Sequence, residues 1–166
     1  MTAHGTISTE IADAQFYEFL ERFFGDLGAV MHAATVLIGD RIGLYRAMAE
    51  HGWQTREQIA DATGTHARYA SEWLAAQAAS AYAEYDQASG RFRLSPVQVL
   101  ALTGGTPCSM LPGGLLAAAT LFLDLDVICD AFVTGQGLSW GEHQPDLTEA
   151  TTRFFRGNYL TNLVPR

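Results

Sequence analysis

Residues 53–95 decide the fold: WQTREQIADATGTHARYASEWLAAQAASAYAEYDQASGRFRLS. Thr55 precedes a periodic apolar run and Gln58 follows three residues later, which is the pattern of a capping box. The pattern predicts a helix over residues 56–63 that ends at Gly64, a residue suited to a left-handed C-terminal cap. Thr65 can cap a second helix over residues 66–79. Two helices joined by so short a turn are typical of a helix-turn-helix.

The stretch after the second helix changes its periodicity. Residues 82–85 and 91–94 are short alternating runs, and the segment between them ends in Gly90. Such a pattern predicts a β-hairpin. A helix-turn-helix followed by a hairpin is a winged helix, so we predict a mainly α fold built on a winged helix-turn-helix with a small β-hairpin.

Helices are also predicted on both sides of this core. The predicted helices are residues 11–24, 27–38 and 41–50 before it and, after it, residues 96–102, 115–133 and 146–155. Gly25 separates the first two, and the Gly-rich and Pro-rich segment 103–114 predicts a loop. The domain organisation that we expect is a loose tail (1–10), a helical winged-helix domain (11–102) and a helical extension (103–166).

The predicted helix over residues 115–133 is apolar on more than one side. One stripe contains Leu121 and Leu125, and another contains Leu123 and Val127. A helix with this pattern is covered from more than one direction. In a chain of 166 residues, we expect part of that surface to contact a partner subunit or another domain.

Composition excludes several classes of function. The net charge is −8, which repels a phosphate backbone, and all ten basic residues are arginine. A chain without lysine has no Schiff-base or P-loop lysine. No signal peptide or membrane span is recognisable, so we expect a cytoplasmic protein with no membrane partner. In the reducing cytoplasm, Cys108 and Cys129 are expected to be free thiols.

DNA binding is the usual role of a winged helix, and its charge pattern is weak here. Residues 53–95 contain four arginines and five acidic residues, a net charge of −1. The candidate DNA contacts are Arg68, Arg91 and Arg93, and the two wing arginines can pair with Glu84 and Asp86 across the hairpin. A mostly apolar stripe of the second helix is predicted to pack inward: Tyr69, Ala70, Trp73, Leu74 and Gln77. A packing or dimerisation module is therefore favoured, and a DNA-binding regulator is the alternative.

Few residues carry a recognisable chemical motif. The five histidines have no metal-ligand spacing, so neither a metal site nor a catalytic residue is predicted. His143 follows Trp140 and Glu142 in a loop, where it can line a pocket or make one local hydrogen bond. Gly113 and Gly114 ahead of a helix are interpreted as a flexible start of that helix, since a lone glycine pair is weak evidence for anion binding.

Five segments together carry a family resemblance. They are residues 36–48 (VLIGDRIGLYRAM), 65–80 (THARYASEWLAAQAAS), 82–86 (YAEYD), 140–143 (WGEH) and 153–159 (RFFRGNY). The chain resembles the N-terminal region of bacterial, especially actinobacterial, class I S-adenosylmethionine-dependent methyltransferases that carry an N-terminal winged helix. Some members of that family are labelled transcriptional regulators.

The resemblance implies a role in dimerisation and in covering a substrate pocket. It implies a homodimer or heterodimer through helices 11–38 and 115–133, with a methyltransferase domain or a paralogue as partner. It makes Trp140, His143 and Phe154 candidate pocket residues. S-adenosylmethionine is the cofactor of the family, but the catalytic Rossmann-like domain and its Gly-rich motif are lacking in these residues. We therefore assign no cofactor-binding residue and expect the chain to be inactive alone.

Overall fold

The computed structural model describes residues 9–103 and 111–162, and the chain divides into two units, residues 1–34 and 35–166. The helices are α1 (Thr9–Ile42), α2 (Leu44–His51), α3 (Arg56–Thr63), α4 (Ala67–Ala79), α5 (Pro96–Leu102), α6 (Leu111–Leu123), α7 (Leu125–Thr134) and α8 (Pro145–Asn162). The strands are β1 (Glu84–Asp86) and β2 (Arg91–Arg93), and a short 3-10 helix, η1, covers Trp140–Glu142. The fold is mainly α, as predicted.

Helix α1 corrects the prediction of separate helices before the winged helix. It runs without interruption through Gly25, where we predicted a break. A single glycine costs a helix only about 1 kcal/mol relative to alanine, which is too little to end a long one. The helix ends instead at Gly43, whose φ of 89° is left-handed and favours glycine. Helix α2 therefore begins at Leu44, three residues later than predicted.

The first unit is the N-terminal part of α1. Its apolar side chains are exposed within the described residues, and they include Phe16, Phe19, Phe23, Phe24 and Met31. The three-and-four spacing predicts one buried face made of Leu27, Val30, Met31, Ala34, Leu37 and Ile38. All of these are exposed except Leu37, which is partly buried, whereas the fully buried residue, Val36, lies outside the stripe. The prediction of burial is thus wrong for most of this stripe within the single chain.

The helix-turn-helix confirms most of the capping prediction. Thr55 and Gln58 form the reciprocal capping box, and Gly64 ends α3 in the left-handed conformation with φ of 64°. The cap of α4 is a correction. His66 caps this helix, because its Nδ1 accepts a hydrogen bond from the amide of Arg68. The hydroxyl of Thr65 instead contacts the hydroxyl of Thr63.

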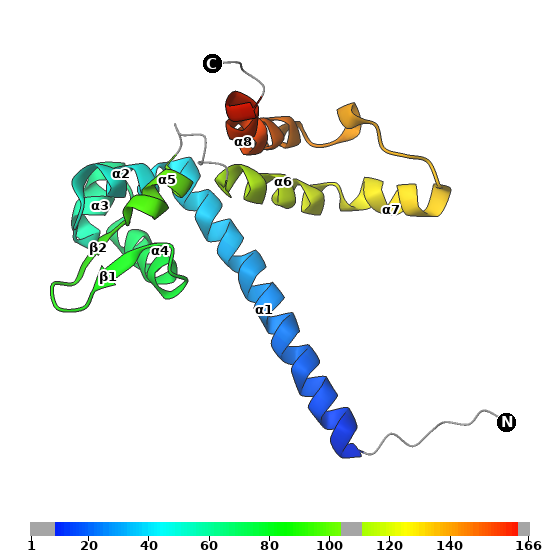
Figure 1. Ribbon diagram of the computed structural model, residues 1–166, viewed down its shortest axis with the longest axis horizontal. Coiled ribbons are helices and arrows are strands. Elements are labelled where there is room, and N and C mark those ends of the chain that lie inside the picture. Colours follow the sequence, from blue (N-terminus) through cyan, green and yellow to red (C-terminus); the bar gives the residue numbers. More distant parts are fainter. Residues whose placement is uncertain (1–8, 104–110, 163–166) are drawn as a thin grey trace. The chain divides into compact units, whose positions relative to one another are not determined.

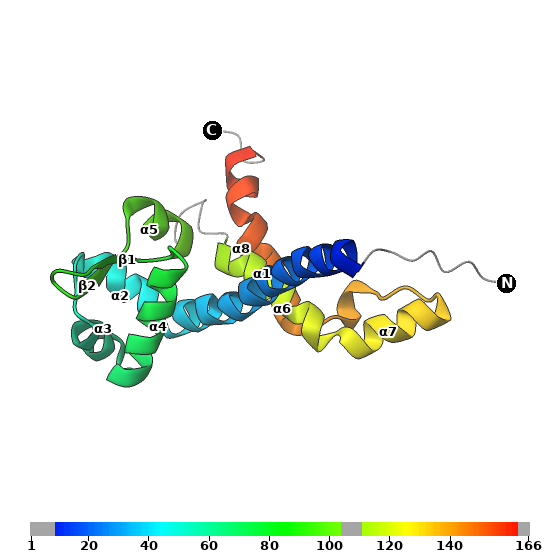
Figure 2. The same ribbon diagram turned by 90° about the horizontal axis from the view of Figure 1, so that it is seen from below.

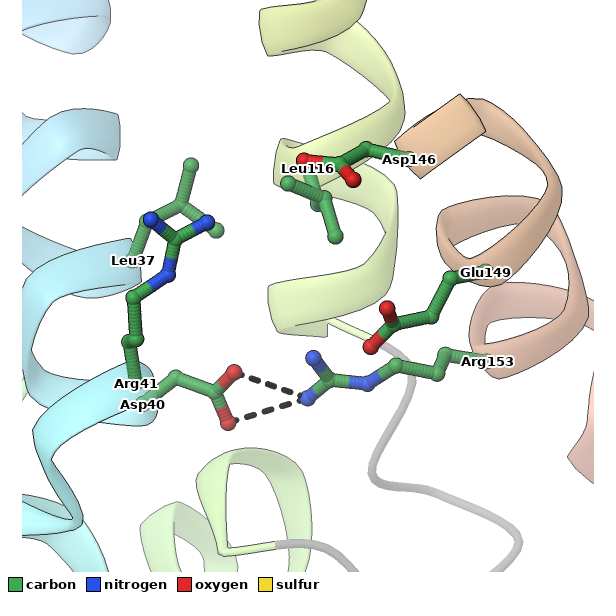
Figure 3. A pocket seen from close by; sticks show the side chains of 7 residues that line it. All are labelled: Leu37, Asp40, Arg41, Leu116, Asp146, Glu149 and Arg153. Atoms are coloured by element: carbon green, nitrogen blue, oxygen red, sulfur yellow. Dashed lines mark hydrogen bonds and ion pairs between the residues drawn. The ribbon is translucent and has the colours of Figure 1, made fainter. Parts of the chain in front are cut away.

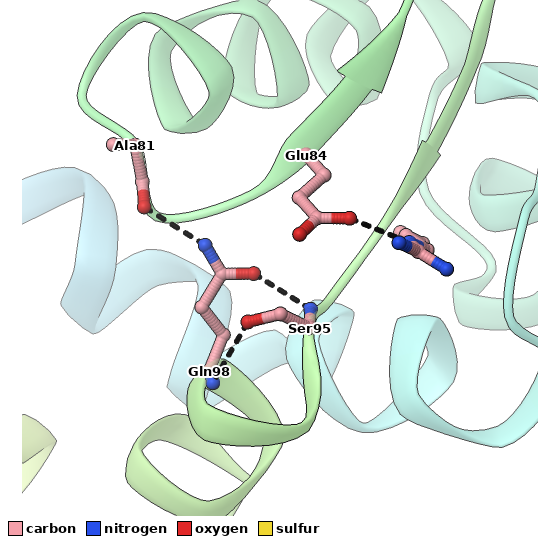
Figure 4. A network of polar contacts seen from close by, with 5 residues as sticks. Ala81, Glu84, Ser95 and Gln98 are labelled. Carbon is pink, nitrogen blue, oxygen red and sulfur yellow. Dashed lines mark hydrogen bonds and ion pairs between the residues drawn. The ribbon is translucent and has the colours of Figure 1, made fainter.

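The wing is an antiparallel hairpin that pairs Glu84 with Arg93 and Asp86 with Arg91. The hydroxyl and amide of Ser89 and the amide of Ala88 donate to the Asp86 carboxylate, and these hydrogen bonds lower the pKa of Asp86. At the other end of the hairpin, Ser95 and Gln98 form a capping box at the start of α5. Figure 4 shows that the Gln98 side chain also donates to the carbonyl oxygen of Ala81, which fixes α5 beside the turn after α4.

The core of the second unit lies between the winged-helix elements. Helices α2, α3 and α4 and the hairpin lie together in both views (Figures 1 and 2). The buried cluster includes Val36, Leu44, Tyr45, Met48, Ile59, Trp73, Leu74, Phe92 and Leu102. Burial raises the pKa of the Tyr45 phenol, which donates a 2.6 Å hydrogen bond to Gln77. Tyr69 is a correction, because 74% of it is exposed although we predicted that it packs inward.

The C-terminal helices depart from the predicted boundaries. The predicted helix over residues 115–133 is two helices, α6 and α7, which are separated at Asp124. Helix α6 begins at Leu111, inside the predicted loop 103–114, and Cys108 of that loop lies outside the described residues. Helix α8 begins at Pro145 instead of Asp146 and continues beyond Phe155. Figure 1 shows α6 beside α8.

Gly113 and Gly114 allow the contact between these two helices. A Cβ on Gly113 would lie 2.9 Å from the backbone nitrogen of Phe154, and a Cβ on Gly114 would lie 2.8 Å from the Phe154 ring. The interpretation of this pair as a flexible start of a helix is therefore wrong. The absence of side chains lets the backbones approach.

No single helix in the described part of the chain is both long and apolar enough to span a bilayer, and among these residues only the sharply bent pair α1 and α2 meets both criteria together.

Candidate functional site

A buried acid and a histidine meet at the break between α6 and α7. The carboxylate oxygen Oδ2 of Asp124 lies 2.8 Å from Nδ1 of His143. The Asp124 side chain is 1% exposed and that of His143 is 21% exposed. Asp124 is the N-cap residue of α7, yet its side chain makes no capping hydrogen bond. Its carboxylate is directed to the histidine instead.

The local sequence explains how His143 reaches this position. Gly135 ends α7 in the left-handed conformation, with φ of 71°, and turns the chain back. Ser139 and Glu142 then form a capping box around η1, and His143 follows it directly. The hydrogen bonds from Ser139 lower the pKa of Glu142. The loop between α7 and α8 is therefore ordered by caps at both of its turns.

His143 borders an open groove of about 410 Å³ between α7 and this loop. The other lining residues are mostly apolar or glycine: Ile128, Ala131, Phe132, Gly135, Gln136, Gly137 and Leu138. The Trp140 ring lies edge-on to the His143 ring, with centroids 6.1 Å apart. A ligand in this groove would meet one ring nitrogen amid an apolar lining.

Phe154, the third candidate pocket residue, lies on α8 and packs in a different place. Its ring lies against Gly114 of α6 and stands edge-on to Phe155, with centroids 5.1 Å apart. It does not line the groove at His143. The structure thus brings Trp140 and His143 together and gives Phe154 a role in the contact between α6 and α8.

A second, more enclosed pocket of about 210 Å³ is charged (Figure 3). Its lining residues are Leu37, Asp40, Arg41, Leu116, Asp146, Glu149 and Arg153. Figure 3 shows Arg153 of α8 directed at Asp40 of α1, and its Nη2 lies 2.9 Å from both carboxylate oxygens. This half-buried ion pair connects helices that are distant in sequence. Among the described residues, no cluster of three or more potential ligands could hold a metal ion.

The wing arginines are engaged within the domain. Arg93 contacts Glu84, as predicted, and its guanidinium lies 4.5 Å from the centre of the Trp53 ring. Arg91 donates to the carbonyl oxygen of Trp53 and does not pair with Asp86 in the described contacts. Arg68 is exposed on α4. Two of the three candidate DNA contacts therefore have intramolecular partners, which does not favour DNA binding.

The comparison with family models gives the fold a name. The model of the Rv2258c-like winged HTH domain matches residues 27–104. Residues 27–104 are therefore a winged HTH domain of the Rv2258c-like type. The matched range of this winged HTH domain contains α2 to α5 and the hairpin, and it ends before α6. No curated protein sequence matches the chain significantly.

Solved structures share the fold of the winged HTH domain and the helices around it. The mitomycin 7-O-methyltransferase MmcR aligns with a TM-score of 0.67 and 17% identity, over 90% of this chain and 47% of that one. The S-adenosylmethionine-dependent methyltransferase SibL gives 0.62 and 18%, over 86% and 45%. Human N-acetylserotonin methyltransferase gives 0.57 and 19%, over 86% and 41%. The chain spans less than half the length of these structures.

The sequence indicated His143 but not its partner. Asp124 lies 19 residues away in the chain, within a run that we predicted as one apolar helix. The signal for it was weak, because the most apolar segment of the chain contains three aspartates, Asp124, Asp126 and Asp130, and a carboxylate needs a polar partner only if it is buried. That rule predicts that a partner exists, but it does not predict which residue it is.

Proposed function

We propose that this chain is the N-terminal dimerisation and substrate-capping module of an S-adenosylmethionine-dependent methyltransferase, and that it is inactive alone. The observation that carries the proposal is the extent of the likeness. Between 86% and 90% of the chain aligns with three methyltransferase structures, on a winged HTH domain and its flanking helices together. A generic winged helix would account for the central part only.

The exposed apolar residues support the dimerisation part of the proposal. The N-terminal part of α1 exposes a series of aromatic side chains, and α7 leaves Phe132 87% and Val133 86% exposed. Monomeric proteins rarely expose large contiguous apolar patches. We propose that helices α1, α6 and α7 are covered by a second copy or by a paralogue in a heterodimer.

The described residues do not fit S-adenosylmethionine. A dinucleotide-like cofactor site of a Rossmann-type domain needs a parallel strand followed by a Gly-rich loop and a helix. The only strands within residues 9–103 and 111–162 are two strands of three residues each, which form an antiparallel hairpin. We therefore assign no residue of this chain to the cofactor and place the transfer chemistry in a separate catalytic domain.

The inactive-module proposal predicts the outcome of a cofactor titration. Isothermal titration calorimetry of the 166-residue chain with S-adenosylmethionine should show no saturable heat. The same titration with a full-length methyltransferase of similar fold is the positive control. Saturable binding to this chain at micromolar concentration would place a cofactor site in it and contradict the proposal.

The dimer proposal predicts that two charges on α1 separate the subunits. Phe23 and Met31 are 50% and 66% exposed in the single chain. The double variant F23E/M31E should weaken association by at least about 100-fold, because burying two carboxylates in an apolar interface costs several kcal/mol. Sedimentation equilibrium over a range of protein concentrations measures the dissociation constant.

The matched control places a glutamate on the same helix outside the apolar series. Arg22→Glu adds an acidic side chain at an exposed position and should leave the dissociation constant within about threefold, as expected of a rim charge. A wild-type chain that is monomeric at every concentration would contradict the homodimer form of the proposal. Equal effects of F23E/M31E and R22E would contradict the assignment of the interface to α1.

A further inference from the structure

We infer that the groove between α4 and the wing is a binding site for small aromatic carboxylates, with Arg56 as the cation that pairs with the carboxylate. The groove has a volume of about 570 Å³, which is in the range of small-molecule sites. Its lining residues come from α3, α4 and the hairpin, all within the winged HTH domain. The inference goes beyond the proposed function, because none of these elements is assigned to the dimer.

Small side chains of α4 form one side of the groove. Ser71, Ala75 and Ala79 follow one another at intervals of four residues, and Ala78 lies next to them in the lining. Residues four apart in an α-helix lie on the same face. This face of α4 is therefore low and mostly apolar, and a flat molecule can lie against it without displacing a long side chain.

Two aromatic rings of the wing form another side of the groove. Tyr85 of β1 and Phe92 of β2 are partners in the strand register, and their ring centroids lie 4.6 Å apart. Phe92 is buried, whereas 46% of Tyr85 is exposed. The tyrosine ring thus packs on its buried neighbour and still offers aromatic surface to a ligand. Aromatic rings pack favourably on one another in offset or edge-on arrangements, which favours an aromatic ligand.

Arg56 is the charged member of the described lining. Its Nη1 donates a 3.2 Å hydrogen bond to the hydroxyl of Ser71, which ties the guanidinium to the α4 side of the groove. Its Nε lies 3.8 Å from the Glu57 carboxylate, which is longer than a hydrogen bond, and both side chains of this ion pair are exposed. Exposed ion pairs are weak. Most N–H donors of the guanidinium are therefore available to a ligand.

The chemistry of the lining selects an anion with one planar charged group. A guanidinium binds a carboxylate through two parallel hydrogen bonds. No acidic side chain lines the described groove, which disfavours a cation. Glu57 does not line it, and hydrogen bonds from its own backbone amide and from the Thr55 hydroxyl lower its pKa. One arginine amid apolar surface does not suit a polyanion such as DNA, whose binding needs several phosphate contacts.

The test compares 2-naphthoate with 2-naphthamide, which has the same ring system and a planar polar group but no charge. Binding to the 166-residue chain is followed by NMR chemical-shift titration at low salt, with the dissociation constants taken from residues of α4 and the hairpin. We expect 2-naphthoate to bind with a dissociation constant of about 1 mM or lower. We also expect it to bind at least about threefold more tightly than the amide.

Two variants separate the charge from the shape of the groove. Arg56→Gln keeps a hydrogen-bonding side chain but removes the charge, so 2-naphthoate should bind no more tightly than 2-naphthamide, and the amide should keep its affinity within about twofold. Ala75→Leu places a larger side chain in the lining and should weaken both compounds at least about fivefold. Both substituted positions are exposed, so the fold should be retained, and circular dichroism checks this.

The matched controls are exposed residues of the same two helices that do not line the groove. Arg68→Gln removes a charge from α4, and Ala62→Leu enlarges a side chain of α3; both should bind like the wild type. A preference for 2-naphthoate that persists in Arg56→Gln, equal binding of the two compounds to the wild-type chain, or the absence of binding of both would each overturn the inference. Equal losses in Ala62→Leu and Ala75→Leu would also overturn it.

Discussion

Replacing Gly39 by alanine is expected to lower the free energy of unfolding of the 35–166 unit by about 2 kcal/mol, even though alanine is the better helix former. Gly39 lies within α1, and a Cβ there would stand 2.3 Å from Cζ2 of Trp73 and 2.9 Å from Cε2 of Tyr45. Contacts this short do not occur between real side chains. Both rings would have to move.

The rings cannot move at low cost, because hydrogen bonds hold each of them. The Trp73 indole donates to the carbonyl oxygen of Thr35 over 2.8 Å, and the Tyr45 hydroxyl donates to Gln77. Gln77 in turn donates to the hydroxyl of Thr35. The two rings also stand edge-to-face, with centroids 4.9 Å apart. A shift of either ring breaks a buried polar contact, which adds to the cost of overpacking.

The measurement is urea unfolding followed by circular dichroism and by tryptophan fluorescence. Gly25→Ala is the matched control on the same helix, since a Cβ on Gly25 meets nothing within 4 Å. It should leave stability unchanged or raise it by up to about 1 kcal/mol through helix propensity. If Gly39→Ala were as stable as Gly25→Ala, the core would accommodate a methyl group at position 39, and the expected clash with Trp73 and Tyr45 would be contradicted.

The comparison of these two glycines explains what the sequence could predict. The caps at Thr55 and Ser95 were predictable because each depends on one side chain and an amide three residues away. Gly25 and Gly39 have the same local signal, and only tertiary packing separates them. Gly25 lies in open space, whereas Gly39 lies against a tryptophan 34 residues away in the sequence. Neither glycine ends α1, so the local signal that predicted a helix break at Gly25 distinguishes neither the end of the helix nor the packed glycine.

The residues of the candidate site also separate into those with a local sequence signal and those whose contacts depend on tertiary packing. His143 and Trp140 could be singled out because they share one short loop, and their rings stand edge-on with centroids 6.1 Å apart. The buried partner Asp124 could not be predicted, because the apolar run contains Asp124, Asp126 and Asp130, and nothing in the local sequence marks which of the three is buried at a helix break. The two wing arginines were predicted to be able to pair with Glu84 and Asp86 across the hairpin, and Arg93 pairs with Glu84, its partner in the strand register. The contact of Arg91 with the Trp53 carbonyl oxygen depends on the β-bridge at Gln54 and was not predictable.

Gly113→Ala is the second substitution with a large expected effect, because it acts on a backbone contact between two helices. A Cβ on Gly113 would lie 2.9 Å from the Cβ of Arg153, 2.9 Å from the backbone nitrogen of Phe154 and 3.1 Å from the carbonyl oxygen of Ala150. A side chain can rotate away from such a contact, but backbone atoms within a helix cannot. Helix α8 would have to move away from α6 as a whole.

We expect this displacement to cost about 2 kcal/mol, the middle of the range for overpacking. It would also lengthen the Arg153–Asp40 ion pair, whose arginine is on the same turn of α8. Hydrogen exchange read by mass spectrometry should show faster exchange in α6 and α8, and nearly unchanged exchange in α3 and α4. That pattern would separate a local opening of the C-terminal helices from a general loss of stability.

Gly141→Ala is the matched control, because a Cβ at position 141 meets nothing within 4 Å and the residue lies in η1, outside the α6–α8 contact. Its exchange pattern should equal that of the wild type. If Gly113→Ala exchanged like Gly141→Ala, α8 would accommodate a methyl group at position 113 without moving. That result would contradict the expected clash with the backbone of α8. If it accelerated exchange equally in α3 and α4, the C-terminal helices and the winged HTH domain would unfold as one unit, and the energy of the contact would be shared by the whole of residues 35–166.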